Sequence, residues 1–109
     1  MSDPVRQLKK GLTTLIVLSA LEKGELYAYG LRRHAFERTK GTFDFSEGAL
    51  YPLLHGLQRC GLVRARLAEV GGRSRKYYAI TAEGRRALVA LRRDWQHVLD
   101  CLEAILRAE

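Results

Sequence analysis

The spacing of hydrophobic residues divides the chain into helical and strand-like segments. Apolar positions three and four apart are typical of helices, whereas apolar residues that alternate with polar ones are typical of strands. These patterns predict, in chain order, helices at 5–22, 28–39 and 47–60, strands at 62–70 and 76–81, and a last helix from 82 to about residue 106. Two strand-like runs joined by a glycine-containing loop, here GGRSR at 71–75, read as a β-hairpin. No repeat or linker interrupts the pattern, so one compact unit is expected.

The first predicted helix is apolar on nearly every side between Leu12 and Leu21. A helix of this kind must be buried all round, and a chain of 109 residues has little material with which to surround it. We therefore expect a second subunit to cover part of it, through Leu12, Leu15 and Ile16; the alternative is a central core helix of a monomer. The candidate core residues of the second predicted helix are Tyr29, Leu31, Ala35 and Phe36.

The last predicted helix carries apolar residues at alternating intervals of three and four. The series covers nearly three heptads and consists of Leu88, Leu91, Trp95, Val98, Leu102 and Ile105. A sustained heptad seam is typical of a helix that packs against a second copy of itself. At 1.5 Å per residue this helix is ~36 Å long, longer than a domain of this size needs. The pattern predicts a homodimer; the alternative is a helix that folds back on its own domain.

The third predicted helix contains Pro52, although proline inside a helix costs ~3 kcal/mol or more. Ser46 precedes the helix as a good N-cap. Four leucines gather on one side of the helix: Leu50, Leu53, Leu54 and Leu57. The opposite side and its flank hold Gly48, Pro52, His55 and Arg59, with Tyr51 and Gln58. Small and compact residues suit a face that another surface approaches closely, and the polar ones suit base edges and phosphates. We interpret this face as a nucleic-acid contact; the alternative is a solvated face with an accidental kink.

Basic residues concentrate in the predicted hairpin. Between positions 64 and 76 the chain has one acid, Glu69, and five cations: Arg64, Arg66, Arg73, Arg75 and Lys76. A hairpin directly after a candidate recognition helix indicates the wing of a winged helix-turn-helix, and its arginines suit the DNA backbone or minor groove. The alternative is a solvated charge run. The predicted fold class is mainly α with a small β-hairpin: a winged helix-turn-helix plus a long C-terminal dimerisation helix.

Composition and charge support a polyanionic partner. The chain has 19 Lys and Arg against 12 Asp and Glu, a net charge of +7, which favours nucleic acid or an acidic membrane surface. The hairpin has no Trp or Phe beside it to insert into a bilayer, which weakens the membrane alternative. Two cysteines, no secretory signal and no apolar run of ~18 residues indicate a reduced, cytoplasmic protein.

Motifs of catalysis are missing from the sequence. It contains no Gly-rich nucleotide loop, metal-protease motif or nucleophile elbow. His97 and Cys101 lie four apart on the last helix, but two ligands are a weak signal for a metal. The sequence therefore predicts no enzyme, no cofactor and no metal site.

Five short motifs resemble the PadR family of bacterial transcriptional regulators. They are Leu50-Tyr51-Pro52, Gly61-Leu62, Gly71-Gly72-Arg73, Arg75-Lys76-Tyr77-Tyr78 and Thr81-Ala82-Glu83-Gly84, and GELYAYGL at 24–31 fits the family's second helix. The resemblance covers essentially the whole chain and suits the shorter subfamily with a single C-terminal helix. One position departs from it: Ala49 stands where the family often has threonine, so one hydroxyl contact is expected to be missing.

The resemblance implies a homodimeric repressor that binds double-stranded DNA at a pseudo-palindromic promoter site and responds to a small aromatic or hydrophobic effector. Residues 1–81 would form the DNA-binding domain, with the first helix contributing to the dimer, and residues 82–109 the dimerisation helix. The expected DNA contacts on the third helix are Ser46, Gly48, Ala49, Tyr51, Pro52, His55 and Arg59. An effector cavity is expected at Leu8, Leu12, Leu15 and Trp95; alternatively, Trp95 is simply interface core. The rival function is a winged-helix module for protein interaction or non-specific nucleoid binding.

Overall fold

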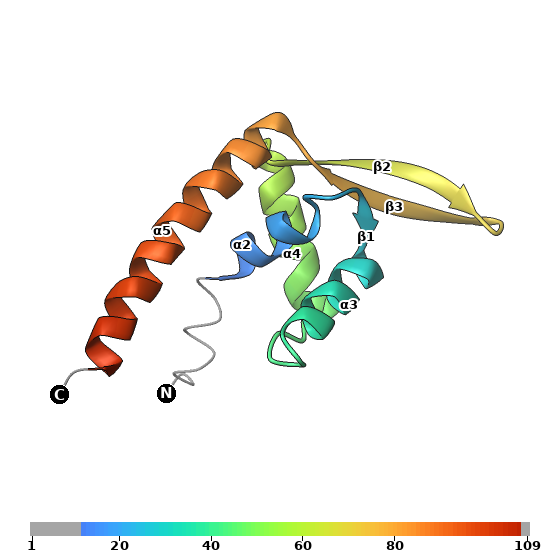
Figure 1. Ribbon diagram of the computed structural model, residues 1–109. Helices are drawn as coiled ribbons and strands as arrows, with labels where there is room; N and C mark the ends of the chain where they lie inside the picture. The colour runs from blue at the N-terminus through green and yellow to red at the C-terminus, as the bar shows by residue number, and fades with distance from the viewer. Residues whose placement is uncertain (1–11, 108–109) are drawn as a thin grey trace.

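The computed structural model describes residues 12–107, and its elements follow the predicted order. Helices α2, α3, α4 and α5 span Thr13–Ala20, Ala28–Arg38, Glu47–Arg59 and Ala82–Leu106, and strands β1, β2 and β3 span Leu26–Tyr27, Val63–Val70 and Arg73–Ile80. The fold class is the predicted one, mainly α with a small antiparallel sheet and a long C-terminal helix (Figure 1). The part of the first predicted helix before residue 12, with Leu8, lies outside the described residues.

One hydrophobic core lies where the helices meet the inner half of the sheet. Its largest fully buried side chains come from every helical region and from both long strands: Val17, Leu18, Leu21, Leu31, Leu50, Leu54, Val63, Tyr78 and Leu88. The hairpin of β2 and β3 projects from one side of this body, and α5 extends from the other side (Figure 1). The fold therefore leaves two extended surfaces, one on the hairpin and one on the far half of α5.

Two of the core residues predicted in α3 are in fact exposed. Leu31 and Ala35 are buried as expected, but Tyr29 and Phe36 keep 55% and 46% of their surface exposed. At 100° per residue these two side chains lie roughly 140–160° round the helix from Leu31, so one face cannot bury all four. A Cβ added at Gly41 would lie 3.4 Å from the Phe36 ring, which shows that the ring covers the turn after α3 instead.

The sheet contains a strand that the hydrophobic pattern does not predict. β1 consists of Leu26 and Tyr27, which pair antiparallel with Tyr78 and Tyr77 of β3, so the strand order is β1-β3-β2. Two residues are too few to show alternation, and their partners lie far along the chain. As a result of this pairing, the start of α3 is held beside the hairpin (Figure 1).

The hairpin turn is tighter than predicted. Val70 pairs with Arg73, which leaves only Gly71 and Gly72 in the turn. Both glycines have positive φ, 58° and 79°, as the type I′ turns of two-residue hairpins require. The predicted five-residue loop is therefore wrong in length, and Arg73 and Arg75 belong to β3 rather than to a flexible tip.

The start of α5 is tied to the loop between α4 and β2. The Thr81 hydroxyl donates to the carbonyl of Gly61 at 2.6 Å and accepts from the amide of Gly84 at 2.9 Å. The Thr81 amide donates to the carbonyl of Leu62 at 3.1 Å. A Cβ built on Gly84 would lie 2.1 Å from that same carbonyl oxygen. Thr81 and Gly84 together therefore fix the place where α5 leaves the body.

The apolar seam of α5 is divided between the chain's own core and its surface. Leu88 is 2% exposed, and Leu91 packs in part against the core. Farther along, the seam residues are 46–69% exposed: Val98, Leu102 and Ile105. The prediction of Leu88 as a dimer contact is corrected, because its side chain has no surface left for a second copy. None of the described helices is both long and apolar enough to cross a bilayer.

Candidate nucleic-acid interface

Helix α4 begins at the predicted cap and continues through Pro52 to Arg59. Ser46 is the N-cap, and its Oγ accepts a hydrogen bond from the amide of Ala49 at 3.2 Å. The buried side of the helix consists of Leu50, Leu54 and Leu57. Pro52 has no N–H for the carbonyl of Gly48, and both residues are exposed. The proline therefore removes a backbone donor on the side of the helix that faces away from the core.

All seven predicted contact residues of this helix are exposed. The ring of Tyr51 lies 6.5 Å from that of His55. A shallow hollow farther along the helix is lined by Pro52, His55, Gln58 and Arg59. A Cβ at Gly48 would meet only the Ser46 hydroxyl, at 3.9 Å, so another surface can approach the helix backbone there. The exposed side of α4 thus combines close access to the backbone with hydrogen-bonding side chains.

One of the five predicted wing cations is paired within the chain. Arg66 Nε donates to both carboxylate oxygens of Glu25, at 2.9 and 3.1 Å, and Nη2 of Arg66 contacts the same carboxylate. The hydrogen bond from Arg66 lowers the pKa of Glu25. The guanidinium also lies 5.3 Å from the ring centre of Tyr77. Arg66 therefore ties β2 to the segment before β1, and its charge is already partnered.

The other wing cations divide into two groups. Arg64 and Arg73 are exposed, and Arg73 lies beside the turn at the far end of the hairpin. The Arg75 guanidinium stacks 4.6 Å from the ring centre of Tyr27, and Lys76 Nζ lies 5.8 Å from the ring centre of Tyr78. Arg75 and Lys76 line a cavity of about 240 Å³ between β3 and the first turns of α3 and α4.

This cavity also includes side chains that sequence reasoning missed, among them Arg32 and Tyr78. Burial raises the pKa of the Tyr78 phenol, with a further contribution from Tyr51, so the phenol keeps its proton at neutral pH. Nothing in the sequence separates Arg32 from Arg33. In the structure they differ, because Arg33 forms an exposed ion pair with Glu37 at 2.9 Å, whereas Arg32 lines the cavity.

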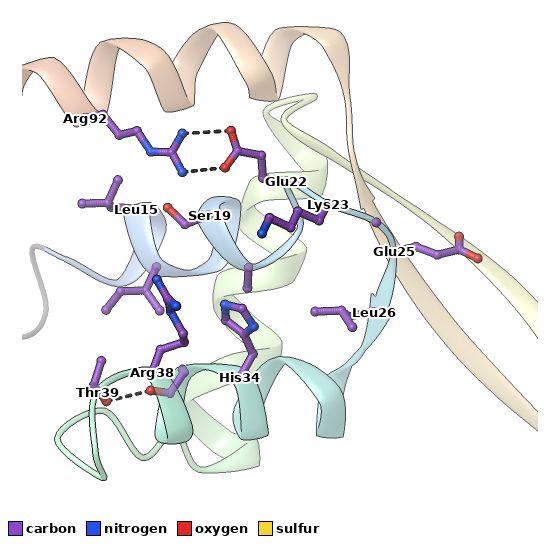
Figure 2. A pocket seen from close by; sticks show the side chains of 14 residues that line it. Leu15, Ser19, Glu22, Lys23, Glu25, Leu26, His34, Arg38, Thr39 and Arg92 are labelled. Atoms are coloured by element: carbon purple, nitrogen blue, oxygen red, sulfur yellow. Dashed lines mark hydrogen bonds and ion pairs between the residues drawn. The ribbon is translucent and has the colours of Figure 1, made fainter.

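A larger pocket of about 640 Å³ lies between α2, α3 and α5 (Figure 2). Leu15 and Leu26 contribute to its apolar walls. Figure 2 shows His34 and Arg38 rising from α3 toward α2, while Lys23 points in from the segment after α2. The pocket therefore pairs apolar walls with basic side chains.

The α5 side of this larger pocket is closed by an ion pair. Arg92 donates to the two carboxylate oxygens of Glu22, at 2.7 and 2.9 Å (Figure 2). The hydrogen bond from Arg92 lowers the pKa of Glu22. Of the predicted effector residues only Leu15 lines this pocket; Leu12 and Trp95 do not, and Leu8 lies outside the described residues.

The described residues contain no cluster of three His, Cys, Asp or Glu side chains that could hold a metal ion. The contact between His97 Nε2 and Cys101 Sγ measures 3.8 Å. Two side chains on an exposed helix face do not complete a metal site.

Comparison with known proteins places this arrangement in a family. Residues 17–90 match the Transcriptional regulator PadR-like family. The chain is 32% identical over 89 residues to the transcriptional regulator Rv3488 of Mycobacterium tuberculosis, and the match covers 82% of this chain and 80% of that protein.

Two solved structures are similar along nearly their whole length. One is the PadR-like transcriptional regulator BC4206 of Bacillus cereus, at 32% identity and a TM-score of 0.83, which covers 94% of this chain and 99% of that one. The other is a PadR family transcriptional regulator from Eggerthella lenta, at 28% identity and a TM-score of 0.81, with 96% and 90% covered.

The family match runs from α2 through α4 and the hairpin into α5, so it includes every described residue of the candidate interface. Members of this family are transcriptional regulators that bind DNA, not enzymes. The chain belongs to the PadR-like family of transcriptional regulators.

Proposed function

We propose that this protein is a cytoplasmic transcriptional repressor that binds a pseudo-palindromic promoter site as a homodimer. The observation that carries the proposal is the exposed, polar side of α4 next to a cationic hairpin. In this proposal residues 1–81 carry the DNA contacts, and residues 82–109 form the dimerisation helix.

Helix α4 has the dimensions and chemistry of a major-groove reader. An α-helix fits the major groove of B-DNA, where each base pair shows a distinct pattern of donors and acceptors. Tyr51, His55 and Arg59 present donors on the exposed side of α4. The small Gly48 lies at the helix start, where the amides that Ser46 does not cap favour a phosphate. The first turns would therefore approach the backbone, and the later turns the base edges.

The hairpin would supply contacts that do not depend on sequence. Arg64 and Arg73 are exposed on β2 and β3, and among the described residues neither forms an ion pair. Exposed cations of this kind bind phosphates and release counterions, which makes the affinity depend on salt. The hairpin would thus position the protein on the duplex, and α4 would select the base sequence.

Substitutions on the two elements should have different effects. Arg73→Ala is expected to weaken binding to all duplexes alike and to reduce the slope of log affinity against log salt by about 1. His55→Ala is expected to change the ranking of sites, because it removes a group that faces base edges. Titrations of a selected site and a random duplex at several salt concentrations measure both effects.

Arg107→Ala is the matched control for this comparison, because it removes one exposed positive charge at the far end of α5. The assignment of roles would be reversed if Arg73→Ala changed the ranking of sites and His55→Ala left it intact. The rival function, a non-specific nucleoid or protein-interaction module, would be favoured if no variant changed any ranking.

The homodimer is proposed to form through the exposed half of the α5 seam. Val98, Leu102 and Ile105 continue the heptad spacing beyond the region that the chain's own core covers. Large apolar residues also flank this row, namely Leu99 and Leu106, at 49% and 75% exposed. A contiguous apolar strip on a helix is typical of an interface between helices. We propose a second copy of this chain as its occupant.

We further propose that a small aromatic or hydrophobic effector binds the larger pocket rather than the predicted site at Trp95. The pocket touches α2 and α5 on the dimer side and α3 on the DNA side. A ligand there would change the angle between α3 and the helices on the dimer side, α2 and α5. That angle sets the distance between the two recognition helices of the dimer. His34, Arg38 and Lys23 favour an effector that carries an acidic group (Figure 2).

A planar aromatic carboxylate such as 2-naphthoate tests the effector proposal. We expect it to raise the melting temperature of the protein, because a ligand that binds only the folded state stabilises that state. We also expect it to weaken binding to DNA, because it would change the distance between the two recognition helices. Arg38→Ala should lose both effects, while Arg33→Ala, on the same helix but outside the pocket lining, should keep them. A panel of aromatic acids that shifts neither the melting temperature nor the DNA affinity would contradict the proposal.

A further inference from the structure

The smaller cavity, of about 240 Å³, is lined by two residues that each carry a buried polar atom without a hydrogen-bond partner. We call it the α3–β3 pocket, and its lining consists of Tyr27, Ala28, Tyr29, Arg32, Glu47, Tyr51, Ser74, Arg75, Lys76 and Tyr78. Within residues 12–107 the structure shows two such buried side-chain atoms, Arg32 Nε and the Tyr78 hydroxyl. Both residues line this one pocket.

The Tyr78 hydroxyl is unusual for a core side chain. Tyr78 is 1% exposed and packs in the centre of the sheet. Buried polar groups in folded proteins are nearly always hydrogen-bonded, and an exception calls for an explanation. A phenylalanine would fill the same space without leaving a polar atom unpaired. The hydroxyl and Arg32 Nε are therefore best explained by a ligand that accepts hydrogen bonds from both.

The other groups around the pocket favour an anion. Arg75 lies over the ring of Tyr27 at 4.6 Å, and this contact orients its guanidinium beside the pocket. Lys76 adds a second strand cation, and Glu47 is the one acid in the lining. Helix α3 also begins here, and its N-cap, Tyr27, offers no side-chain hydrogen bond to the first amides. Free amides at a helix start attract oxyanions.

The position of the pocket indicates where such an anion comes from. Tyr51 belongs both to the exposed side of α4 and to the pocket, and Arg75 and Lys76 belong both to the hairpin and to the pocket. An anion held here lies between the two elements that are proposed to contact DNA. When a helix enters the major groove, the phosphates that border the groove lie at its flanks.

We propose that the α3–β3 pocket binds one phosphate of the DNA backbone, with Arg32 and the Tyr78 hydroxyl as donors to its oxygens. This inference rests on the proposed function, because it takes α4 to lie in the major groove. The contact would position the protein on the duplex and carry no sequence information. It also gives β1 a role, since the pairing of β1 with β3 places the start of α3 against Tyr78.

Tyr78→Phe removes only the hydroxyl and tests the proposal most cleanly. The melting temperature should not fall, because the hydroxyl has no partner within the described residues. Affinity for a selected site and for a random duplex should fall about tenfold each, as expected for a lost hydrogen bond to a charged group. The slope of log affinity against log salt should stay unchanged, because a phenol releases no counterion. Tyr77→Phe, the neighbouring residue outside the pocket, is the control and should bind like the wild type.

Arg32→Gln supplies the second arm of the experiment. It should weaken binding to both duplexes and also lower the salt slope by about 0.9, the value for one phosphate contact. Arg33→Gln removes the same charge from the next position of α3, outside the pocket, and should leave the slope unchanged.

The outcomes separate this inference from the proposed function. If the wild type selects a defined site but Tyr78→Phe and Arg32→Gln bind every duplex like the wild type, the phosphate site is refuted and the repressor proposal stands. If inorganic phosphate stabilises the wild type and not Tyr78→Phe, while DNA affinity is unchanged, the pocket holds a free anion and the proposal is again refuted. If the wild type binds no duplex, the phosphate site and the repressor proposal are both refuted.

Discussion

Gly84→Ala is expected to lower the free energy of unfolding by about 3 kcal/mol, the upper part of the usual range for overpacking. A Cβ at this position would lie 2.1 Å from the carbonyl oxygen of Leu62 and 2.7 Å from Cγ1 of Ile80. The nearer atom is backbone, so no side-chain rotation relieves the contact. To make room, α5 must move away from the loop before β2, which strains the 3.1 Å hydrogen bond from the Thr81 amide to Leu62.

Urea denaturation measures this loss, and Gly56→Ala is its matched control. Gly56 also lies inside a helix, but a Cβ there would meet nothing within 4 Å. Because alanine favours a helix by up to ~1 kcal/mol over glycine, Gly56→Ala should be as stable as the wild type or more so. A Gly84→Ala protein that matched the wild type would show that α5 does not press against the Leu62 carbonyl.

Leu102→Arg is expected to convert the proposed homodimer into a monomer and to weaken DNA binding by ~100-fold or more. Leu102 lies in the middle of the exposed apolar row of α5 and is 46% exposed in the single chain. A charge there would be buried without a partner in the dimer, whereas in the monomer it reaches water and leaves the fold intact. A monomer holds one half-site at a time, so the gain from binding two linked half-sites is lost.

Light scattering with circular dichroism separates loss of the dimer from loss of the fold. Gln96→Arg adds the same charge on the opposite side of α5, where it can pair with Asp100, and should remain dimeric. The proposed interface would be refuted by a dimeric Leu102→Arg protein. A monomeric wild type would refute the homodimer itself.

The local features of the fold could be predicted from the sequence. The capping hydroxyl of Ser46, the leucine side of α4 and the double glycine of the hairpin are each decided by neighbours within a few residues. Such features depend on backbone sterics and on helical or strand spacing. The exposed side of α4 follows from the same spacing, which is why all its predicted residues are exposed.

Features that depend on distant pairings could not be predicted. β1 has its partner in β3, and Arg66 has its partner in Glu25, before β1. Both pairings follow from how the sheet closes, and neither leaves a periodic pattern in the sequence. The α3–β3 pocket arises for the same reason, since the β1–β3 pairing holds the start of α3 beside the sheet.

The seam of α5 shows a second reason why the sequence could not predict every feature. Heptad spacing indicates that a helix face is covered, but it does not say by what. Leu88 and Leu102 occupy equivalent seam positions, two heptads apart, yet the chain's own core covers the first and leaves the second 46% exposed. The boundary is set by how far the body extends along α5, which depends on the tie between Thr81 and the loop after α4.

Selection of bound sites from a pool of random duplexes, at physiological salt, tests the central claim most directly. A dimer that places α4 in two successive major grooves should enrich an inverted repeat whose half-site centres lie about 10–10.5 base pairs, or a multiple of this, apart. Enrichment of such a repeat is the predicted result. A pool that emerges with no preferred sequence, bound by a protein that modest salt releases from every duplex alike, would contradict the account.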